Sequence, residues 1–228
     1  MKKGVTIIAE AGVNHNGKIE LAKRLIEKAA DSGADYVKFQ TFKADKIVTK
    51  LADKASYQLK NINNKDNSQY AMLKKLEIPM DWYNKLIEHS NSFGIKFLST
   101  GFDIDSIDFL YKLGMDFFKI PSGEITNKPY LEHVSSKGLP IVLSTGMATM
   151  KEIKDALNIF LKNGINKKNI TILHCNTEYP TPLKDVNLKA MNFIKKKLDI
   201  DVGYSDHTLG IEVSIGAAAL GAKVIEKH

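Results

Sequence analysis

The 228-residue sequence contains one cysteine, Cys175, and one arginine, Arg24. A single cysteine cannot form a disulfide within the chain, which excludes a disulfide-stapled secreted fold and favours a reducing, cytoplasmic location. No apolar run approaches the roughly 18 residues of a membrane-spanning helix. The basic start of the chain leads into an apolar stretch that Glu10 interrupts, which fits a first strand better than a signal peptide. We therefore expect no membrane partner.

Positive charge is present without the features of a nucleic-acid-binding protein. The net charge is +7, but the lysines are scattered over expected helix surfaces and no RNA-type aromatic motif accompanies them. We expect no nucleic-acid partner. Because Arg24 lies in an expected helix, the chain lacks an arginine fork for binding carboxylate or phosphate groups. An anion must be held by lysines, hydroxyls and backbone N–H groups, or by an arginine from elsewhere.

A repeated pattern organises the chain: a helical segment ends at a glycine, and a short apolar strand follows. Eight strands are expected near Thr6–Glu10, Tyr36–Gln40, Lys96–Thr100, Phe117–Pro121, Ile141–Thr145, Thr171–Cys175, Asp201–Ser205 and Lys223–His228. Seven amphipathic helices alternate with them. This pattern predicts one domain over residues 1–228, an α/β fold of the (β/α)8 TIM-barrel type. An open doubly wound sheet is the alternative, but no G-x-G-x-x-G follows the first strand.

Two features depart from a regular barrel. The chain stops at His228, after the eighth strand and before an eighth helix, so we expect a truncated barrel with apolar surface exposed near Val224 and Ile225. A long polar insert, residues 41–78, follows the second strand. Such loops in compact domains are usually functional or disordered, and we interpret this one as a substrate-covering loop containing short helices.

Polar residues collect at the carboxyl ends of all eight strands, where the active sites of barrel enzymes lie. They are Glu10, Lys38, Gln40, Ser99, Thr100, Lys119, Ser122, Glu124, Ser144, Thr145, His174, Asn176, Ser205, Asp206, His207, Glu226 and His228. Any one of them could be a hydrogen-bonded structural residue. Eight strands all ending in this way favours a functional site.

Two lysines at these ends, Lys38 and Lys119, form an anion cradle when hydroxyl groups surround them. Lys38 and Gln40 share one face of their strand because side chains alternate along it. An ion pair with Glu10 or Glu124 is the structural alternative for either lysine. A Schiff-base lysine, as in many barrel aldolases, is the chemical alternative.

His207 and His228 end the seventh and eighth strands, which are neighbours in a closed barrel. Two imidazoles there can bind a divalent metal and leave positions open to water and substrate. Asp206 is a candidate for orienting His207. His174 is interpreted as structural.

Eight motifs in order resemble the sialic acid synthase family over essentially the whole chain: "IAEAGVNHNG", "VKFQTF", "FLSTGFD", "KIPSGEITN", "LSTGMAT", "LHCNTEYPTP", "GYSDHTLG" and "VIEKH". The family includes the legionaminate and pseudaminate synthases. The resemblance implies condensation of phosphoenolpyruvate with an N-acetylated hexosamine, giving a nine-carbon 2-keto sugar acid.

The resemblance also implies a role for each matching position. Phosphoenolpyruvate would be held by Lys38, Thr100, Lys119, Ser122 and Ser205. The sugar would be contacted by Gln40, Glu124 and Tyr179, and either Asn176 or Thr177 would contact the carboxylate. Glu10 would handle a proton or orient a group, Glu124 would act on the reacting centre, and His207 and His228 would bind Mn²⁺ or Mg²⁺.

The family continues beyond the position of His228 with an eighth helix and an antifreeze-like domain that reaches a partner's sugar site. A homodimer is therefore expected for the full-length protein. N-acetylmannosamine and its diacetylated 6-deoxy analogues stay open as substrates. The other hypotheses are a Schiff-base aldolase, another phosphoenolpyruvate-condensing 3-deoxy keto acid synthase, and a non-catalytic barrel fragment.

Overall fold

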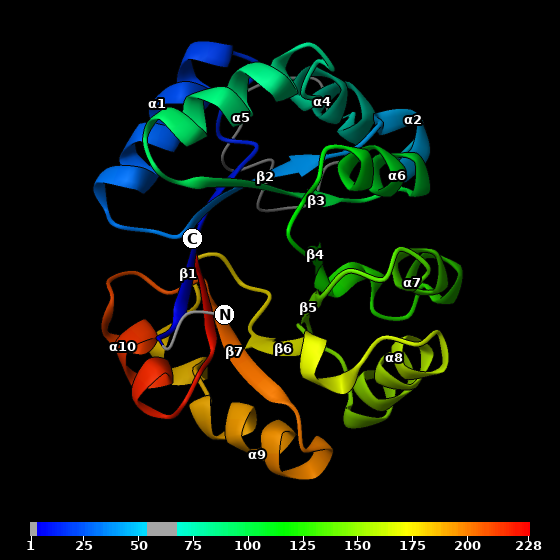
Figure 1. The fold of residues 1–228 in the computed structure, drawn as a ribbon, viewed down its shortest axis with the longest axis vertical. Helices are drawn as coiled ribbons and strands as arrows, with labels where there is room; N and C mark the ends of the chain where they lie inside the picture. Colours follow the sequence, from blue (N-terminus) through cyan, green and yellow to red (C-terminus); the bar gives the residue numbers. More distant parts are fainter. Residues whose placement is uncertain (1–3, 54–67) are drawn as a thin grey trace.

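The computed structural model describes residues 4–53 and 68–228, and it shows eight parallel strands surrounded by helices (Figure 1). The strands are β1 (Thr6–Gly12), β2 (Tyr36–Thr41), β3 (Lys96–Gly101), β4 (Phe118–Ile120), β5 (Ile141–Ser144), β6 (Ile170–Cys175), β7 (Asp201–Asp206) and β8 (Val224–Lys227). Each overlaps its predicted range. The predicted α/β barrel is confirmed.

Outside the insert that follows β2, the helices between these strands are α1 (Ile19–Asp31), α5 (Trp82–Ser92), α6 (Ile104–Lys112), α7 (Lys128–Ser135), α8 (Met150–Lys162), α9 (Leu188–Leu198) and α10 (Glu212–Ala219). Short 3-10 helices are η1 (Ser122–Glu124), η2 (Lys167–Asn169) and η3 (Leu183–Asp185). Gly33, Gly94, Gly114, Gly138, Gly164 and Gly221 follow six of the seven helices. Their φ angles of 70–92° are the left-handed caps predicted from the repeat.

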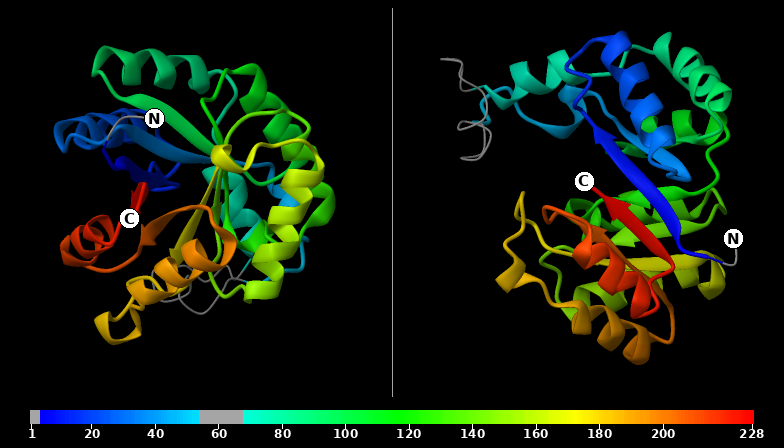
Figure 2. Two further views of the ribbon diagram at one scale, coloured as in Figure 1. Left: turned by 60° about the horizontal axis from the view of Figure 1, so that its bottom comes forward. Right: turned by 90° about the vertical axis from the view of Figure 1, so that its left-hand side faces the viewer.

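The sheet runs in the order β3-β2-β1-β8-β7-β6-β5-β4, so the first and last strands, β1 and β8, pair in parallel. Strands β3 and β4 contact each other without a hydrogen-bonded ladder, which leaves the barrel nearly closed. Seen from two further directions, the helices wrap around the strands (Figure 2). Helices α1 and α10 flank the β1–β8 pair (Figure 1).

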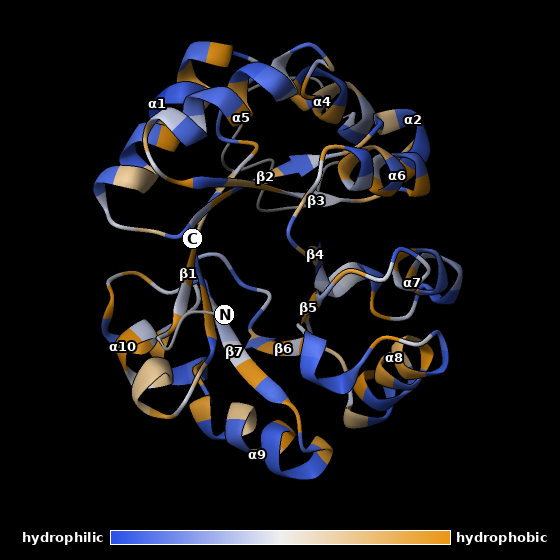
Figure 3. Ribbon diagram, viewed as in Figure 1, coloured by the Kyte–Doolittle hydropathy of each residue, from blue (hydrophilic) through white to orange (hydrophobic). Residues whose placement is uncertain are grey.

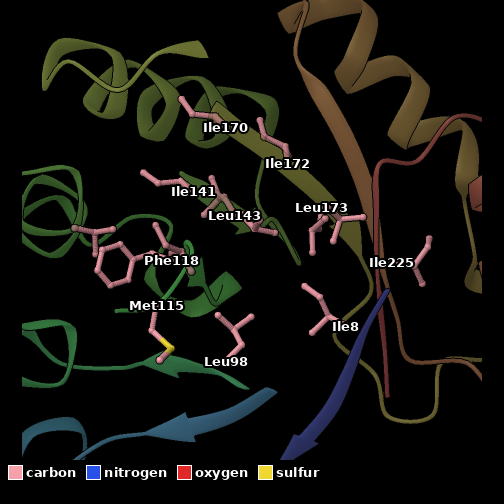
Figure 4. Packing of buried hydrophobic residues seen from close by; sticks show 14 of the residues in the cluster. Ile8, Leu98, Met115, Phe118, Ile141, Leu143, Ile170, Ile172, Leu173 and Ile225 are labelled. Atoms are coloured by element: carbon pink, nitrogen blue, oxygen red, sulfur yellow. The ribbon is translucent and has the colours of Figure 1, made fainter. Parts of the chain in front are cut away.

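Apolar side chains fill the space between the strands and the helices. Helix α1 buries Ala22, Ile26 and Ala29, which share one face, and Figure 3 shows polar and apolar residues alternating around the helices. Inside the barrel the middle is also apolar: Ile8, Leu98 and Leu173, from three different strands, are fully buried (Figure 4). This packing makes the barrel a solid core rather than a pore.

The expectation of exposed apolar surface on the last strand is wrong. Val224 is 3% exposed and Ile225 is 2% exposed. Because β8 lies between β1 and β7, Ile225 pairs with Ile7 on one side and Tyr204 on the other, and α10 also contacts this strand. Neighbours within the barrel therefore bury these side chains without an eighth helix.

The predicted short helices of the insert are present where the chain is described. Helix α2 (Ala44–Ile47) and helix α4 (Gln69–Leu76) belong to it, while residues 54–67 lie outside the described residues. The Tyr70 hydroxyl donates to Asp45 at 2.7 Å and links the two helices. Within residues 4–53 and 68–228, no helix is long and apolar enough to cross a membrane.

Candidate active site

Four ionisable side chains point into the barrel near the carboxyl ends of β1, β2, β4 and β8. Lys38, Lys119 and Glu226 are 2–4% exposed, and the side chain of Glu10 is 8% exposed. Each strand supplies one of them because its inward positions alternate with outward apolar ones. Burying an unpaired charge is costly, so these four groups are expected to contact one another.

The four side chains form a continuous chain of ion pairs. The Lys38 ammonium lies 2.5 Å from Glu10 Oε2 and 3.4 Å from Glu226 Oε1. The Lys119 ammonium lies 3.2 Å from Glu226 Oε2. The Glu10 alternative considered for Lys38 is therefore an actual contact, but Lys119 pairs with neither Glu10 nor Glu124. Its partner is Glu226, a residue to which the sequence assigned no role.

Two hydroxyl groups complete this cluster. Lys38 donates to Thr100 Oγ1 at 3.1 Å, and Ser205 donates to Glu226 Oε2 at 2.6 Å. The short second bond is expected of a hydroxyl that donates to a carboxylate. Residues 38, 100, 119 and 205, all predicted to hold phosphoenolpyruvate, are thus brought together around Glu226.

The two carboxyl groups respond to this environment in opposite ways. Burial raises the pKa of Glu10, although the ammonium of Lys38 works against that effect. Burial also disfavours the charge of Glu226, but Lys119 and Lys38 outweigh it and hold the pKa of Glu226 well below its usual range. Burial acts to lower the pKa of Lys38, and the two carboxylates overcome it, so that pKa is raised. Lys38 is therefore held as an ammonium group.

A second group of small residues lies at the ends of β4, β5 and β6. The hydroxyl of Ser144 is buried and has no hydrogen-bond partner among the described residues. The Gly146 N–H donates to Cys175 Sγ at 3.2 Å, and Cys175 lies 3.5 Å from the Ser122 hydroxyl. Gly146 has φ +43°, and a Cβ there would lie 2.7 Å from Ser122 Cβ, so only glycine fits. Ser144 was noted as a strand-end residue but was not among the predicted site residues.

His207 and His228 lie side by side next to this cluster, with ring centroids 4.2 Å apart and ring planes at 84°. The ring of Tyr179 stacks on His207 at 4.0 Å and meets His228 edge-on at 5.5 Å. His207 Nε2 lies 3.2 Å from Ser205 Oγ, which connects the histidines to Glu226. The predicted adjacency of the two histidines on neighbouring strands is present.

The histidine pair has the donor chemistry of a divalent-metal site. Burial lowers the pKa of His207 to about 4 and that of His228 to about 3, against the raising effect of the Glu226 carboxylate. Both rings are therefore neutral near pH 7 and keep a nitrogen lone pair, as a metal ligand requires. His207 Nδ1 is buried with no hydrogen-bond partner in the described part of the chain. Within that part, no group of three or more His, Cys, Asp or Glu residues is suited to a metal, so water or substrate would supply the other ligands.

The other predicted residues lie around the rim. Gln40 is half-buried at the end of β2, close to Glu10. Glu124, in η1, accepts a 2.7 Å hydrogen bond from the Asn127 side chain. The Asn176 amide donates to the backbone of Asp185 at 3.0 Å, whereas Thr177 is exposed. Asn176 is therefore engaged in holding its own loop.

Asp206 is fully buried, but it does not hydrogen-bond to the His207 ring. Its carboxylate accepts bonds from the Thr208 backbone at 2.8 Å, the Thr208 hydroxyl at 2.7 Å and the Ser214 hydroxyl at 2.5 Å. Its backbone carbonyl accepts from the His228 N–H at 3.1 Å. Asp206 thus fixes the loop after β7 and the end of β8, which places both histidines through the backbone.

A pocket of about 770 Å³ lies at the opposite, amino-terminal end of the barrel. It is lined by residues at the starts of the strands, including Thr6, Tyr36, Lys96 and Thr171. Its charged groups are satisfied: Asp116 accepts from Tyr36 at 2.7 Å and from Lys96 at 2.6 Å. Chemistry in barrel enzymes occurs at the carboxyl ends, so the charged cluster and not this pocket is the candidate active site.

The chain is similar to proteins named as legionaminic acid and sialic acid synthases. It is 58% identical to the N,N'-diacetyllegionaminic acid synthase of Campylobacter jejuni, over 100% of this chain and 68% of that protein. It is 52% identical to the synthase of the same name from Legionella pneumophila, over 97% of this chain and 63% of that protein. The chain thus spans about two thirds of the length of these curated relatives.

A solved structure agrees. The N-acetylneuraminic acid synthetase of Leptospira borgpetersenii, determined with citrate, superposes with a TM-score of 0.84 at 35% identity, covering 99% of this chain and 73% of that one. The sequence profile of the NeuB family matches residues 25–228. These matches confirm the predicted resemblance to a family of synthases. The chain belongs to the NeuB family.

Proposed function

We propose that this chain forms the catalytic barrel of a synthase that condenses phosphoenolpyruvate with an N-acetylated hexosamine. The product is a nine-carbon 2-keto sugar acid of the sialic acid type, and inorganic phosphate is released. The observation that carries this proposal is the buried cluster of two lysines and two carboxylates at the carboxyl ends of the strands. Family membership supports it independently.

The cluster suits an anionic substrate in a chain with a single arginine. Lys38 and Lys119 supply two ammonium groups, and Thr100 and Ser205 place hydroxyls beside them. The hydroxyl of Ser144 at the end of β5, buried and without a hydrogen-bond partner among the described residues, adds a further donor. At an effective dielectric of about 20, an ammonium about 4 Å from a phosphoryl charge contributes about 4 kcal/mol before desolvation.

His207 and His228 would hold a divalent cation, Mn²⁺ or Mg²⁺. When bound there, the ion would supply Lewis-acid polarisation of the sugar aldehyde. The protein's own part is to keep both rings neutral by burial and to fix them through Asp206 and the stacked Tyr179.

Carbon 3 of phosphoenolpyruvate would then attack the aldehyde carbon, water would add at carbon 2, and phosphate would leave. Glu10, whose pKa burial raises, is suited to donate or accept a proton near the lysines. Glu124 and Gln40, at the rim, are the groups we assign to the sugar and to stabilising charge at carbon 2. Asn176 or Thr177 would contact the carboxylate, and Tyr179 the sugar.

The relatives favour one class of sugar. The two synthases with the highest identities given above are both named for N,N'-diacetyllegionaminic acid. Pseudaminic acid synthase of C. jejuni is 33% identical, and human N-acetylneuraminate-9-phosphate synthase is 38% identical. We therefore propose a diacetylated 6-deoxy hexosamine as the substrate. A cytoplasmic location and a homodimeric full-length protein remain part of the proposal.

The Schiff-base alternative is disfavoured by the state of the lysines. A Schiff base needs a neutral amine, but Lys38 contacts two carboxylates and its pKa is raised. Lys119 pairs with Glu226 at 3.2 Å. Neither environment resembles the apolar pocket or cationic neighbourhood that activates a nucleophilic lysine.

The test is a coupled measurement on the full-length protein with phosphoenolpyruvate and Mn²⁺. Phosphate release and the mass of the keto-acid product are followed with the diacetylated 6-deoxy hexosamine and, separately, with N-acetylmannosamine. We expect product with both and a higher kcat/KM for the first. No product with either sugar would refute the proposed function, and a preference for N-acetylmannosamine would refute the proposed sugar class.

A further inference from the structure

Glu226 has no assigned role, yet it occupies the centre of the candidate site. Its side chain is 2% exposed on β8 and reaches groups on three other strands. Oε1 lies 3.4 Å from the ammonium of Lys38 on β2, and Oε2 lies 3.2 Å from that of Lys119 on β4. Oε2 also accepts the 2.6 Å hydrogen bond from Ser205 on β7. Two cations and a hydroxyl donor around one carboxylate keep it ionised.

A purely structural role does not explain this arrangement. A buried ion pair stabilises a fold little compared with apolar residues of similar volume. The barrel already has an apolar middle layer in Ile8, Leu98 and Leu173. In the described part of the chain, Glu226 is the carboxylate that pairs with Lys119, and it joins two lysines whose strands are not neighbours in the sheet.

The hydroxyl of Ser205 gives a second indication. A serine has one proton to donate, and here that proton goes to Glu226. Ser205 therefore cannot donate to a bound anion while this bond persists. The Lys38 ammonium is shared among Glu10, Glu226 and Thr100, and Lys119 pairs with Glu226. An arriving anion must therefore compete with Glu226 for Ser205 and Lys38, and it shares the charge of Lys119 with that carboxylate.

We propose that Glu226 is the positioning residue of the anion site: it holds Lys38, Lys119 and Ser205 in place before the ligand arrives, and it competes with the ligand's phosphate group for them. One carboxylate oxygen faces each lysine, much as two oxygens of a phosphate group would. This inference rests on the proposed function only for the identity of the natural anion.

The first test uses inorganic phosphate as the probe, measured by calorimetry on the full chain. Glu226→Gln keeps the shape of the side chain and removes its charge. Because the competing charge is gone, we expect phosphate to bind about tenfold more tightly, a difference of about 1.4 kcal/mol. Glu226→Asp keeps the charge and should show no tightening. The control is Glu88→Gln, which makes the same charge change on the exposed surface of α5 and should leave the affinity unchanged.

The second test separates kcat from KM in the condensation assay. Glu226→Gln should lower KM for phosphoenolpyruvate and lower kcat by at least about tenfold, because tighter ground-state binding does not stabilise the transition state. Glu226→Asp should lower kcat without lowering KM, because the shorter side chain cannot reach both lysines. A residue that only maintained the fold would raise KM and lower the melting temperature instead.

Several results would overturn the proposal. Among them are unchanged or weaker phosphate binding by a folded Glu226→Gln, equal tightening by Glu226→Asp, and no phosphate binding by the wild-type chain. If circular dichroism shows that Glu226→Gln does not fold, a wild-type kcat in Glu226→Asp would overturn the proposal instead. In a Lys119→Met background, Glu226→Gln should no longer tighten phosphate binding by more than a small part of the expected tenfold. Failure of the wild type to condense the sugar would refute the proposed function alone, since the phosphate titrations need no turnover.

Discussion

Replacing Lys38 with methionine removes the ammonium at the centre of the buried cluster while keeping most of the side-chain volume. Lys38 is 3% exposed and contacts Glu10, Glu226 and Thr100. Glu226 keeps Lys119 as a partner after the substitution, whereas Glu10 loses its 2.5 Å ion pair. The variant therefore contains one orphaned carboxylate, at Glu10, and one cation fewer for an anion.

The size of both effects follows from these contacts. An ammonium near a phosphoryl charge contributes about 4 kcal/mol before desolvation and competition are subtracted. We expect the net loss of binding free energy in the variant to be at least about 1.4 kcal/mol, which is a tenfold weaker affinity for phosphate. Breaking a buried ion pair typically costs about 3–5 kcal/mol of folding free energy. Glu10 can relieve part of that cost by binding a proton, since its pKa is already raised in the wild type.

The stability loss should therefore depend on pH. Without the ammonium the folded-state pKa of Glu10 rises further, so its contribution is present below the unfolded value near 4.5 and is lost as pH rises through the folded value. We expect Lys38→Met to be destabilised by about 3 kcal/mol at pH 8 and by less at pH 5. The double variant Lys38→Met/Glu10→Gln should regain stability at pH 8, because it removes the orphaned charge.

Urea unfolding at the two pH values and phosphate calorimetry at pH 7.5 measure these quantities. Lys151→Met is the matched control: it removes the same charge from an exposed lysine paired with Asp155 on α8, and its phosphate affinity should equal that of the wild type. A folded Lys38→Met with wild-type phosphate affinity would refute the hypothesis that Lys38 and Lys119 form an anion cradle. Equal destabilisation at pH 5 and pH 8 would refute the assignment of the orphaned charge to Glu10.

Four further predictions concern other parts of the molecule. In the wild type, Glu10 should contribute a fall in stability as pH rises from about 4.5 through its raised pKa, opposite in sign to the rise contributed by the lowered pKa values of His207 and His228; Glu10→Gln should therefore make stability rise more steeply with pH in urea unfolding. Chelation should abolish condensation and Mn²⁺ should restore it; His207→Ala should abolish Mn²⁺ binding by calorimetry, and His89→Ala, whose ring pairs with Glu27 outside the site, should not. Borohydride with both substrates should trap no lysine adduct by mass spectrometry, and oxygen-18 in the bridging position of phosphoenolpyruvate should leave with phosphate. Gly203→Ala should cost about 1–3 kcal/mol of folding stability, because its Cβ would clash with the Val224 carbonyl oxygen, whereas Gly123→Ala meets nothing within 4 Å.

The barrel could be predicted from the sequence because its signals are local. A glycine cap after a helix, such as Gly33 or Gly164, needs only the residues around it, and a short apolar strand carries its own signal. Inward and outward positions could also be predicted, since alternation along β2 places Lys38 and Gln40 on one face. The strand-end rule then brought eight chemically varied positions to one mouth.

The partners of the charged residues could not be predicted in the same way. Whether Lys119 meets Glu10, Glu124 or Glu226 depends on how β4 and β8 are staggered across the barrel, which no local pattern reports. The burial of Val224 and Ile225 depends on neighbouring strands and α10 rather than on a following helix. Asp206 was a candidate for orienting His207, but its carboxylate accepts hydrogen bonds from Thr208 and Ser214 instead.

The pairing of all four charges changes what affinity means at this site. If the lysines were free, each would add its full attraction to an anion, and the site would bind phosphate-containing ligands tightly whether or not they reacted. With Glu10 and Glu226 already in contact, an anion gains only the difference between its own interactions and those it replaces. In the proposed reaction the displaced carboxylates would lie beside the reacting centre, where the raised pKa of Glu10 would let it hold a proton. The same contacts that weaken ground-state binding would then place proton-transfer groups next to the bond that forms, so we expect substitutions of Glu10 and Glu226 to change kcat as well as substrate affinity.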